Sequence, residues 1–291
     1  LAYGDEPAQV IELVDWARSS GFEVVAAGQG TELSFDKHGS HEDSLERYGV
    51  TDEFIRQNDP SPEMYNTFLD GTKVAIELCA AANATGLRAD DGGMHMPVTD
   101  REGLLETLIP KSAGGALQRK GVIDAVTPSG YRNPSAFVIT RVENPFTRRY
   151  LQNRYNILTS KDGEYQLFDR QFHLPQETLM SVENVAHDSE PTGLVRSQTA
   201  EVIARAKRDL KVGETLKAGA DTIYGELVGA DIAADAGWVP YELLSGARVR
   251  EQVSTDQPIS RADVKIKTDS VLFNLRQIQD KLGPWRADRN Y

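Results

Sequence analysis

The residues best suited to chemistry lie in residues 66–83, a stretch that is otherwise mostly small and apolar. Lys73 and Glu77 are four positions apart and Asp70 precedes Lys73 by three, so on a helix the three charges share one face. Lys and Glu are rarely buried unless they are paired. Two interpretations follow: a surface ion pair on the one wet face of the helix, or a charged stripe that lines a cleft.

In a cleft, a lysine between two acids suits the reduction of a carbonyl group. Hydride delivery builds negative charge on the carbonyl oxygen, which an ammonium such as Lys73 can stabilise and protonate. Asp70 and Glu77 would hold the amine in place. Gly71 allows a ligand to approach the backbone, and its amide and that of Thr72 lie at the predicted helix N-terminus, where anions are favoured. The predicted catalytic residues are therefore Lys73, Asp70 and Glu77.

Composition limits the class of protein. The 291 residues predict two domains, or one large domain with an appendage. Net charge is -12 and the pI is about 5.0, which argues against nucleic acid or an anionic membrane as a partner. No apolar run approaches the roughly 18 to 20 residues of a membrane span. The expected partner is a small-molecule substrate.

The cysteine content is typical of a reducing compartment, and the cysteine and histidine spacing predicts no structural zinc site. Cys79 is the single cysteine in the sequence, so no internal disulfide can form, and a cytoplasmic location is expected. The five histidines and this cysteine have no structural-zinc spacing. The chain also begins at Leu1 without Met, and we expect the numbering to start inside a longer polypeptide.

Hydrophobic patterning predicts an α/β (α+β) domain with a mixed sheet and a buried central helix at about 70–86. Pro7, preceded by Asp5 and Glu6, opens a first helix, and a short apolar strand follows it. This pair is typical of half a parallel βαβ unit. Further helices are expected at about 42–48, 51–57, 99–108, 143–158 and 176–186, and further strands at about 121–126, 136–141 and 164–168.

The C-terminal third has a different texture of short segments and polar turns, which predicts a small β-rich module. Residues 201–209 have helical composition but also alternate, so the pattern alone leaves helix and strand open. Residues 270–278 are expected to form a helix with Val271, Leu275 and Ile278 packed against another element.

A glycine pair after the first strand suggests a dinucleotide fingerprint, but only weakly. Gly28 and Gly30 flank Gln29, and Leu33 stands where the third glycine would be. No helix clearly opens at Gly30, and no acidic residue ends a second strand about 20 residues further on.

Several segments together resemble one bacterial family. These segments are residues 2–7, 22–28, 68–73, 83–87, 172–174, 191–193 and 206–210. In them the chain is similar to the homoserine-dehydrogenase-like oxidoreductases with a C-terminal SAF domain, including the enzymes that act on 1-deoxy-D-xylulose 5-phosphate as reductoisomerases. The Asp-Gly-Thr-Lys segment at 70–73 is its most specific part.

The resemblance implies an NAD(P)-dependent enzyme whose nucleotide-binding domain precedes residue 1. Residues 1–20 would end that domain, 21–190 would form the substrate and dimerisation domain, 196–265 a SAF domain of β-clip type, and 266–291 a C-terminal helix and tail. Under this interpretation residues 201–207 form a strand. A homodimer or homotetramer is expected.

The resemblance also extends the predicted site. Substrate-binding positions are His173, Asn66 and Thr72, and cofactor-binding positions are Gly71 and Gly4. The cofactor is NADP, and a reductoisomerase also needs a divalent metal ion, for which Asp70 and Glu77 are the acids to watch. The predicted function is NAD(P)H-dependent reduction of a small hydroxylated, in some cases phosphorylated, carbonyl metabolite. The alternative is a non-catalytic carbohydrate-binding or regulatory SAF-domain protein.

Overall fold

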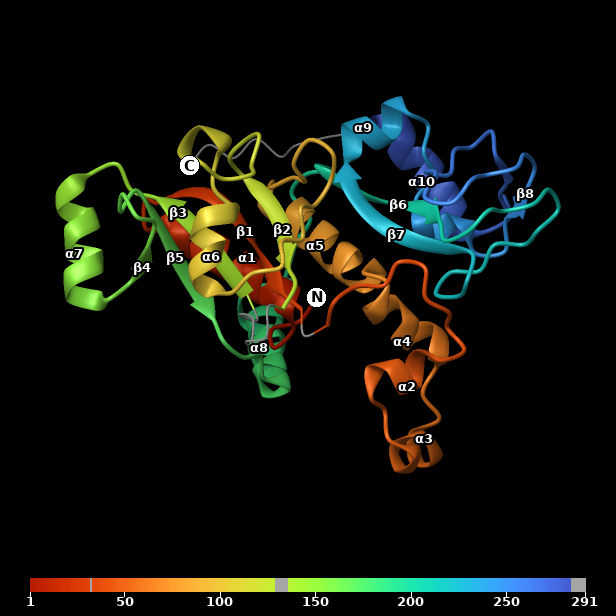
Figure 1. Cartoon of the computed structure of the whole chain (residues 1–291), viewed down its shortest axis with the longest axis horizontal. Helices are drawn as coiled ribbons and strands as arrows, with labels where there is room; N and C mark the ends of the chain where they lie inside the picture. The colour runs from red at the N-terminus through yellow and green to blue at the C-terminus, as the bar shows by residue number, and fades with distance from the viewer. Residues whose placement is uncertain (32, 129–135, 284–291) are drawn as a thin grey trace. The chain divides into compact units, whose positions relative to one another are not determined.

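A computed structural model describes residues 1–31, 33–128 and 136–283 (Figure 1). The described chain forms two compact units. Unit 1 contains residues 1–33 and 77–199, and unit 2 contains residues 34–76 and the described chain from residue 200 onward. The division falls inside one helix, between Ile76 and Glu77.

Unit 1 is built on a mixed five-stranded sheet with strand order β2-β1-β3-β5-β4. β1 and β2 are parallel, with Gly28 opposite Asp124, whereas the other neighbours are antiparallel. The strands are β1 (Glu23–Gly30), β2 (Val122–Val126), β3 (Ala136–Arg141), β4 (Leu158–Thr159) and β5 (Tyr165–Arg170). The predicted α/β class with a mixed sheet is confirmed.

Helices pack on this sheet through apolar side chains. α1 contacts β1, β3 and β5, and α6 contributes Leu104 and Leu105 to the buried core, to which its C-cap residue Leu108 also belongs. Asp100 caps α6 by accepting a hydrogen bond from the Gly103 amide. The helical segments are α1 (Glu6–Ser19), α6 (Arg101–Thr107), η1 (Lys111–Ala113), α7 (Pro145–Tyr155), η2 (Pro175–Glu177) and α8 (Thr178–Asp188).

The expected central helix is preceded by a second helix that the sequence analysis did not predict. α4 (Pro62–Leu69) begins at the capping Ser61 and ends at Asp70, and α5 (Thr72–Thr85) follows. Gly71 joins them with φ of 84°, a left-handed conformation that a residue with a Cβ adopts only with strain.

Burial along α5 is uneven. Val74 and Leu78 are buried, and Cys79 is partly buried. Ile76, however, has 39% of its surface exposed. The expectation of a helix buried on most faces therefore fails at Ile76.

Unit 2 combines short helices with small antiparallel sheets. β6 pairs with β7 along their whole lengths, and β8 pairs with β9. Its strands are β6 (Ala200–Ala206), β7 (Ile223–Gly229), β8 (Arg248–Val249) and β9 (Val264–Lys265). Its other elements are α2 (Ser44–Tyr48), α3 (Asp52–Asn58), α4, α9 (Ala230–Asp235), η3 (Tyr241–Leu244) and α10 (Val271–Leu282). The strand expected at 201–207 is confirmed.

The C-terminal helix forms as expected, but its predicted packing is wrong. Val271, Leu275 and Ile278 are 76%, 59% and 57% exposed. Arg276 of α10 instead pairs with Glu201 of β6, and Asp280 of α10 pairs with Arg261. Polar contacts rather than an apolar stripe therefore hold α10.

Within residues 1–31, 33–128 and 136–283, no helix is long and apolar enough to span a bilayer.

Candidate functional site

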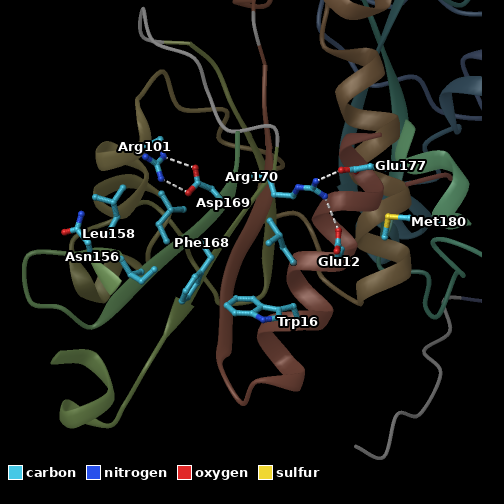
Figure 2. A pocket seen from close by; sticks show the side chains of 13 residues that line it. Glu12, Trp16, Arg101, Asn156, Leu158, Phe168, Asp169, Arg170, Glu177 and Met180 are labelled. Atoms are coloured by element: carbon cyan, nitrogen blue, oxygen red, sulfur yellow. Dashed lines mark hydrogen bonds and ion pairs between the residues drawn. The ribbon is translucent and has the colours of Figure 1, made fainter. Parts of the chain in front are cut away.

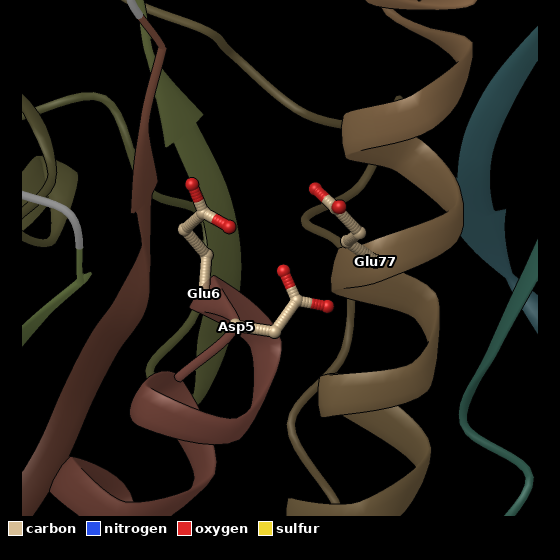
Figure 3. Close-up of side chains that lie close together, drawn as sticks. All are labelled: Asp5, Glu6 and Glu77. Atoms are coloured by element: carbon tan, nitrogen blue, oxygen red, sulfur yellow. The ribbon is translucent and has the colours of Figure 1, made fainter. Parts of the chain in front are cut away.

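Three carboxylates gather in unit 1, and Figure 3 shows them facing a common space. Asp5 and Glu6 come from the start of α1 and Glu77 from α5. One carboxylate oxygen from each lies within 4.8 Å of the others, and all three residues are partly buried. We call these three residues the carboxylate cluster.

Local sequence explains why two of these acids lie at this point. Asp5 is the N-cap residue of α1, Glu6 is in its first turn, and Pro7 follows. The partial positive charge of a helix N-terminus favours acidic side chains there. The Asp5 side chain makes no capping hydrogen bond, so its oxygens are not used to satisfy the helix end.

Gln29 of β1 makes a hydrogen bond with Glu77, the third acid of the carboxylate cluster. Its Nε2 donates a hydrogen bond of 2.7 Å to Glu77 Oε2. Gln29 is only 4% exposed, and its Oε1 has no hydrogen-bond partner among the residues that the structure describes. Buried polar atoms are nearly always hydrogen-bonded, so a lone acceptor beside a carboxylate indicates a place that a ligand completes.

The electrostatics of the cluster favour a proton or a cation. Burial raises the pKa of the Glu6 carboxyl, and its hydrogen bond with Asp5 and the charge of Glu77 act in the same direction. The Glu6 backbone amide and His173 oppose that rise. His173 Nδ1 lies 3.2 Å from Glu6 Oε1.

This donor set suits a hard divalent cation. Mg²⁺ and Mn²⁺ prefer carboxylate and carbonyl oxygens and usually keep several waters. Asp5, Glu6 and Glu77 offer three carboxylates, and Gln29 offers a free amide oxygen close to one of them. The residues present therefore fit such an ion.

Asp70, predicted to act beside Lys73, belongs to a buried ion pair of unit 2. Lys207 Nζ lies 2.8 Å from Asp70 Oδ2, and the two side chains are 1% and 0% exposed. Lys207 Nζ also donates to the Gly39 carbonyl at 3.2 Å. Asp70 Oδ1 accepts a hydrogen bond of 2.9 Å from the Thr72 amide.

Asn66 and Thr72 join this buried region of unit 2. Asn66 Nδ2 donates to the Gly219 carbonyl at 2.9 Å, and Thr72 Oγ1 accepts from the Gly225 amide at 2.8 Å. Tyr241, buried beside Thr72, has its pKa raised by burial. We call Asn66, Asp70, Thr72, Lys207 and Tyr241 the buried network.

The remaining predicted residues are placed as follows. Lys73 lies in the first turn of α5, with Nζ 5.0 Å from the centre of the Phe68 ring. Gly4 has φ of 88°, and a Cβ there would lie 2.3 Å from the Leu174 carbonyl oxygen. His173 and Glu77 therefore share the region of the carboxylate cluster, whereas Asp70, Asn66, Thr72 and Gly71 lie in unit 2.

Sequence reasoning missed Asp5, Glu6, Gln29 and Lys207 as members of these groups. Acids at a helix start are expected for helix stability alone, so Asp5 and Glu6 gave no distinct signal. Gln29 was noticed only inside the weak glycine pattern, which the structure places within β1. Lys207 lies far along the chain from Asp70, and only folding brings them together.

Comparison with known proteins identifies the family. No curated protein matches the chain. Residues 4–178, more than half of the 291, match the family model described as oxidoreductase DRL, catalytic domain. This range includes Asp5, Glu6, Gln29, Glu77 and His173. The chain belongs to the oxidoreductase DRL family and carries its catalytic domain.

Proposed function

We propose that this oxidoreductase uses NAD(P)H to reduce a small hydroxylated carbonyl metabolite that binds at the carboxylate cluster. 1-Deoxy-D-xylulose 5-phosphate is the substrate that the family resemblance suggests. The observation that carries the proposal is the cluster itself, three carboxylates with a free buried amide oxygen beside them. Family membership supports the redox class.

Different residues of unit 1 would bind the cation and the substrate. A divalent cation, when bound, would supply Lewis acidity to a carbonyl oxygen and hold an adjacent hydroxyl. Asp5, Glu6 and Glu77 would hold that cation, with Gln29 orienting Glu77 through its hydrogen bond. His173, already beside Glu6, is the proposed partner of a substrate hydroxyl.

Lys73 stays the predicted proton donor. Lys73 belongs to unit 2, and the role rests on its chemistry: an ammonium can stabilise and protonate the oxygen that receives negative charge during reduction. Asp70 has a different role in the proposal, because its buried pair with Lys207 supports anchoring rather than contact with substrate.

The remaining parts of the proposal rest on the family resemblance. NADP would be held by a domain before residue 1, with Gly4 and Gly71 toward the cofactor. Residues 21–190 would bind substrate and residues 196–265 would be the SAF domain, in a homodimer or homotetramer. No observation favours the non-catalytic alternative.

The proposal can be tested by titrating Mn²⁺ into the protein by calorimetry, with NADPH oxidation in the presence of 1-deoxy-D-xylulose 5-phosphate as a second measurement. Glu77→Gln should weaken Mn²⁺ binding by about 100-fold, a loss of about 2.7 kcal/mol. Turnover should fall by a similar factor. The exposed Glu102→Gln in α6 is the matched control and should change neither quantity.

Two results would count against different parts of the proposal. Equal Mn²⁺ affinity in wild type and Glu77→Gln would remove the cation from the cluster. In a protein that is shown to bind NADPH, metal binding without oxidation of NADPH would leave the site intact and overturn the substrate. A titration with NADPH alone reports whether this chain holds the nucleotide without a further domain.

A further inference from the structure

Unit 1 contains a cavity of about 710 Å³ that the proposed function does not use (Figure 2). It is lined by residues of α1, β4, β5, α6 and the η2–α8 segment. None of the carboxylate cluster residues lines it. Its volume is that of an ordinary small-molecule site.

An aromatic surface lines part of this cavity. Trp16 and Phe168 both line it, with ring centres 4.8 Å apart in an edge-to-face arrangement. Phe22 supports them from behind, stacked on Phe168 at 5.6 Å. Trp16 remains 43% exposed although it is held on two sides, so its ring is both fixed and accessible.

The charges of the lining are distributed unequally. Figure 2 shows Arg101 paired with Asp169, and Arg170 paired with both Glu12 and Glu177. Arg101 is satisfied by a bidentate contact at 2.8 and 2.6 Å. Two carboxylates share the single guanidinium of Arg170, so one negative charge is left over beside it.

One carboxylate oxygen of Glu177 is buried and has no hydrogen-bond partner among the described residues. Glu177 Oε1 accepts from Arg170 at 2.5 Å, whereas Glu177 Oε2 is buried and has no hydrogen-bond partner. An unpaired buried carboxylate oxygen is costly, and a positive charge brought into the cavity beside Glu177 would reduce that cost.

We propose that this cavity binds a small aromatic amine in its protonated form. The ring packs on Trp16 and Phe168, and the ammonium lies beside Glu12 and Glu177, where it balances the extra negative charge next to Arg170. An anionic ligand is disfavoured because both arginines already have carboxylate partners. An uncharged ligand would gain the ring contact alone. The site is independent of the proposed reaction and of its metal.

The test compares three ligands of the same ring size: 2-phenylethylamine, 2-phenylethanol and 3-phenylpropionate. Binding is followed in the folded chain by the chemical shift of the Trp16 indole NH, assigned with Trp16→Phe. We expect the amine to bind at least tenfold more tightly than the alcohol, and the acid to bind more weakly than either. Glu177→Gln should lower amine affinity about tenfold and leave the alcohol unchanged.

Matched variants separate binding from folding. Glu183→Gln, exposed on α8 and outside the cavity, should leave amine binding unchanged. Trp16→Leu lacks the indole signal, so its binding is measured by calorimetric titration, and it should weaken amine and alcohol alike. Circular dichroism checks that each variant is folded. Equal affinity for amine and alcohol, preference for the acid, or no shift of the Trp16 signal with any ligand would each overturn the proposal.

Discussion

The carboxylate cluster of unit 1 and the buried network of unit 2 both take residues from the segment 66–77, yet they differ in how their charge is balanced. Asp70 is fully buried and has a lysine 2.8 Å away. Asp5, Glu6 and Glu77 are only partly buried, and their oxygens converge on one another. A buried charge with an oppositely charged partner in the protein contributes to the stability of the fold. Like charges brought together favour the binding of a proton or a cation.

The largest effect should come from breaking the balanced pair. Lys207→Met leaves Asp70 buried and unpaired, which should lower the free energy of unfolding by about 3–5 kcal/mol. Denaturant unfolding measures this. Lys217→Met breaks the exposed pair with Glu63 and should cost less than about 1 kcal/mol. The double variant Lys207→Met/Asp70→Asn should recover part of the loss. Equal costs for the two lysines would contradict the comparison.

Asp124 tests the same comparison, because it is a buried carboxylate with no lysine partner within the described parts of the chain. Burial raises its pKa to about 6, although the His95 and Met96 amides and the charge of His95 oppose the rise. The folded state then holds this proton more tightly than the unfolded state. Stability should therefore be fullest below about pH 4 and fall as the pH rises through 6, by on the order of 3 kcal/mol.

The measurement for Asp124 is the free energy of unfolding between pH 4 and 7. We expect the difference between wild type and Asp124→Asn to move in favour of the variant as the pH rises. A difference that does not change with pH would show that Asp124 titrates normally in the folded state.

Substitution of Gln29 tests how a residue next to the carboxylate cluster affects cation binding. Gln29→Leu removes the free Oε1 and the hydrogen bond to Glu77, and should weaken Mn²⁺ binding about tenfold, or about 1.4 kcal/mol. Gln29→Glu adds a fourth carboxylate and should strengthen it. Calorimetric titration measures both. Weaker binding in both variants would show that Gln29 acts through packing alone.

The smallest expected effect is on the stability of the cluster without metal. Glu77→Gln removes one of three converging charges, so the free energy of unfolding should rise or stay within about 1 kcal/mol of wild type. Thermal unfolding in the presence of a chelator is the measurement. A clear loss of stability would mean that Glu77 serves the fold, as Asp70 does.

Local patterns predicted most of the elements because their signals are short-range. Pro7 after two acids marked α1, and alternation within 201–207 fits the strand β6. The pattern predicts no helix at 62–69 although Ser61 and Pro62 are good start signals, because Asp70-Gly71 has the composition of a helix start while the structure makes it a junction between two helices. α10 was predicted as a helix, but its exposed Val271 shows that an apolar stripe does not by itself identify a packing partner.

The sequence by itself determined the class of fold and, through motif resemblance, the oxidoreductase family, because periodicity and motifs are carried by neighbouring residues. Residues 201–207 are open between helix and strand on pattern alone, and only the resemblance favours the strand that forms there. Only the tertiary structure decided which charges meet. Asp70 pairs with Lys207 from 137 positions away, and Glu77 meets Asp5 and Glu6. The reason is physical: helical spacing fixes which side chains share a face, but burial and the opposite partner depend on segments that chain folding brings together.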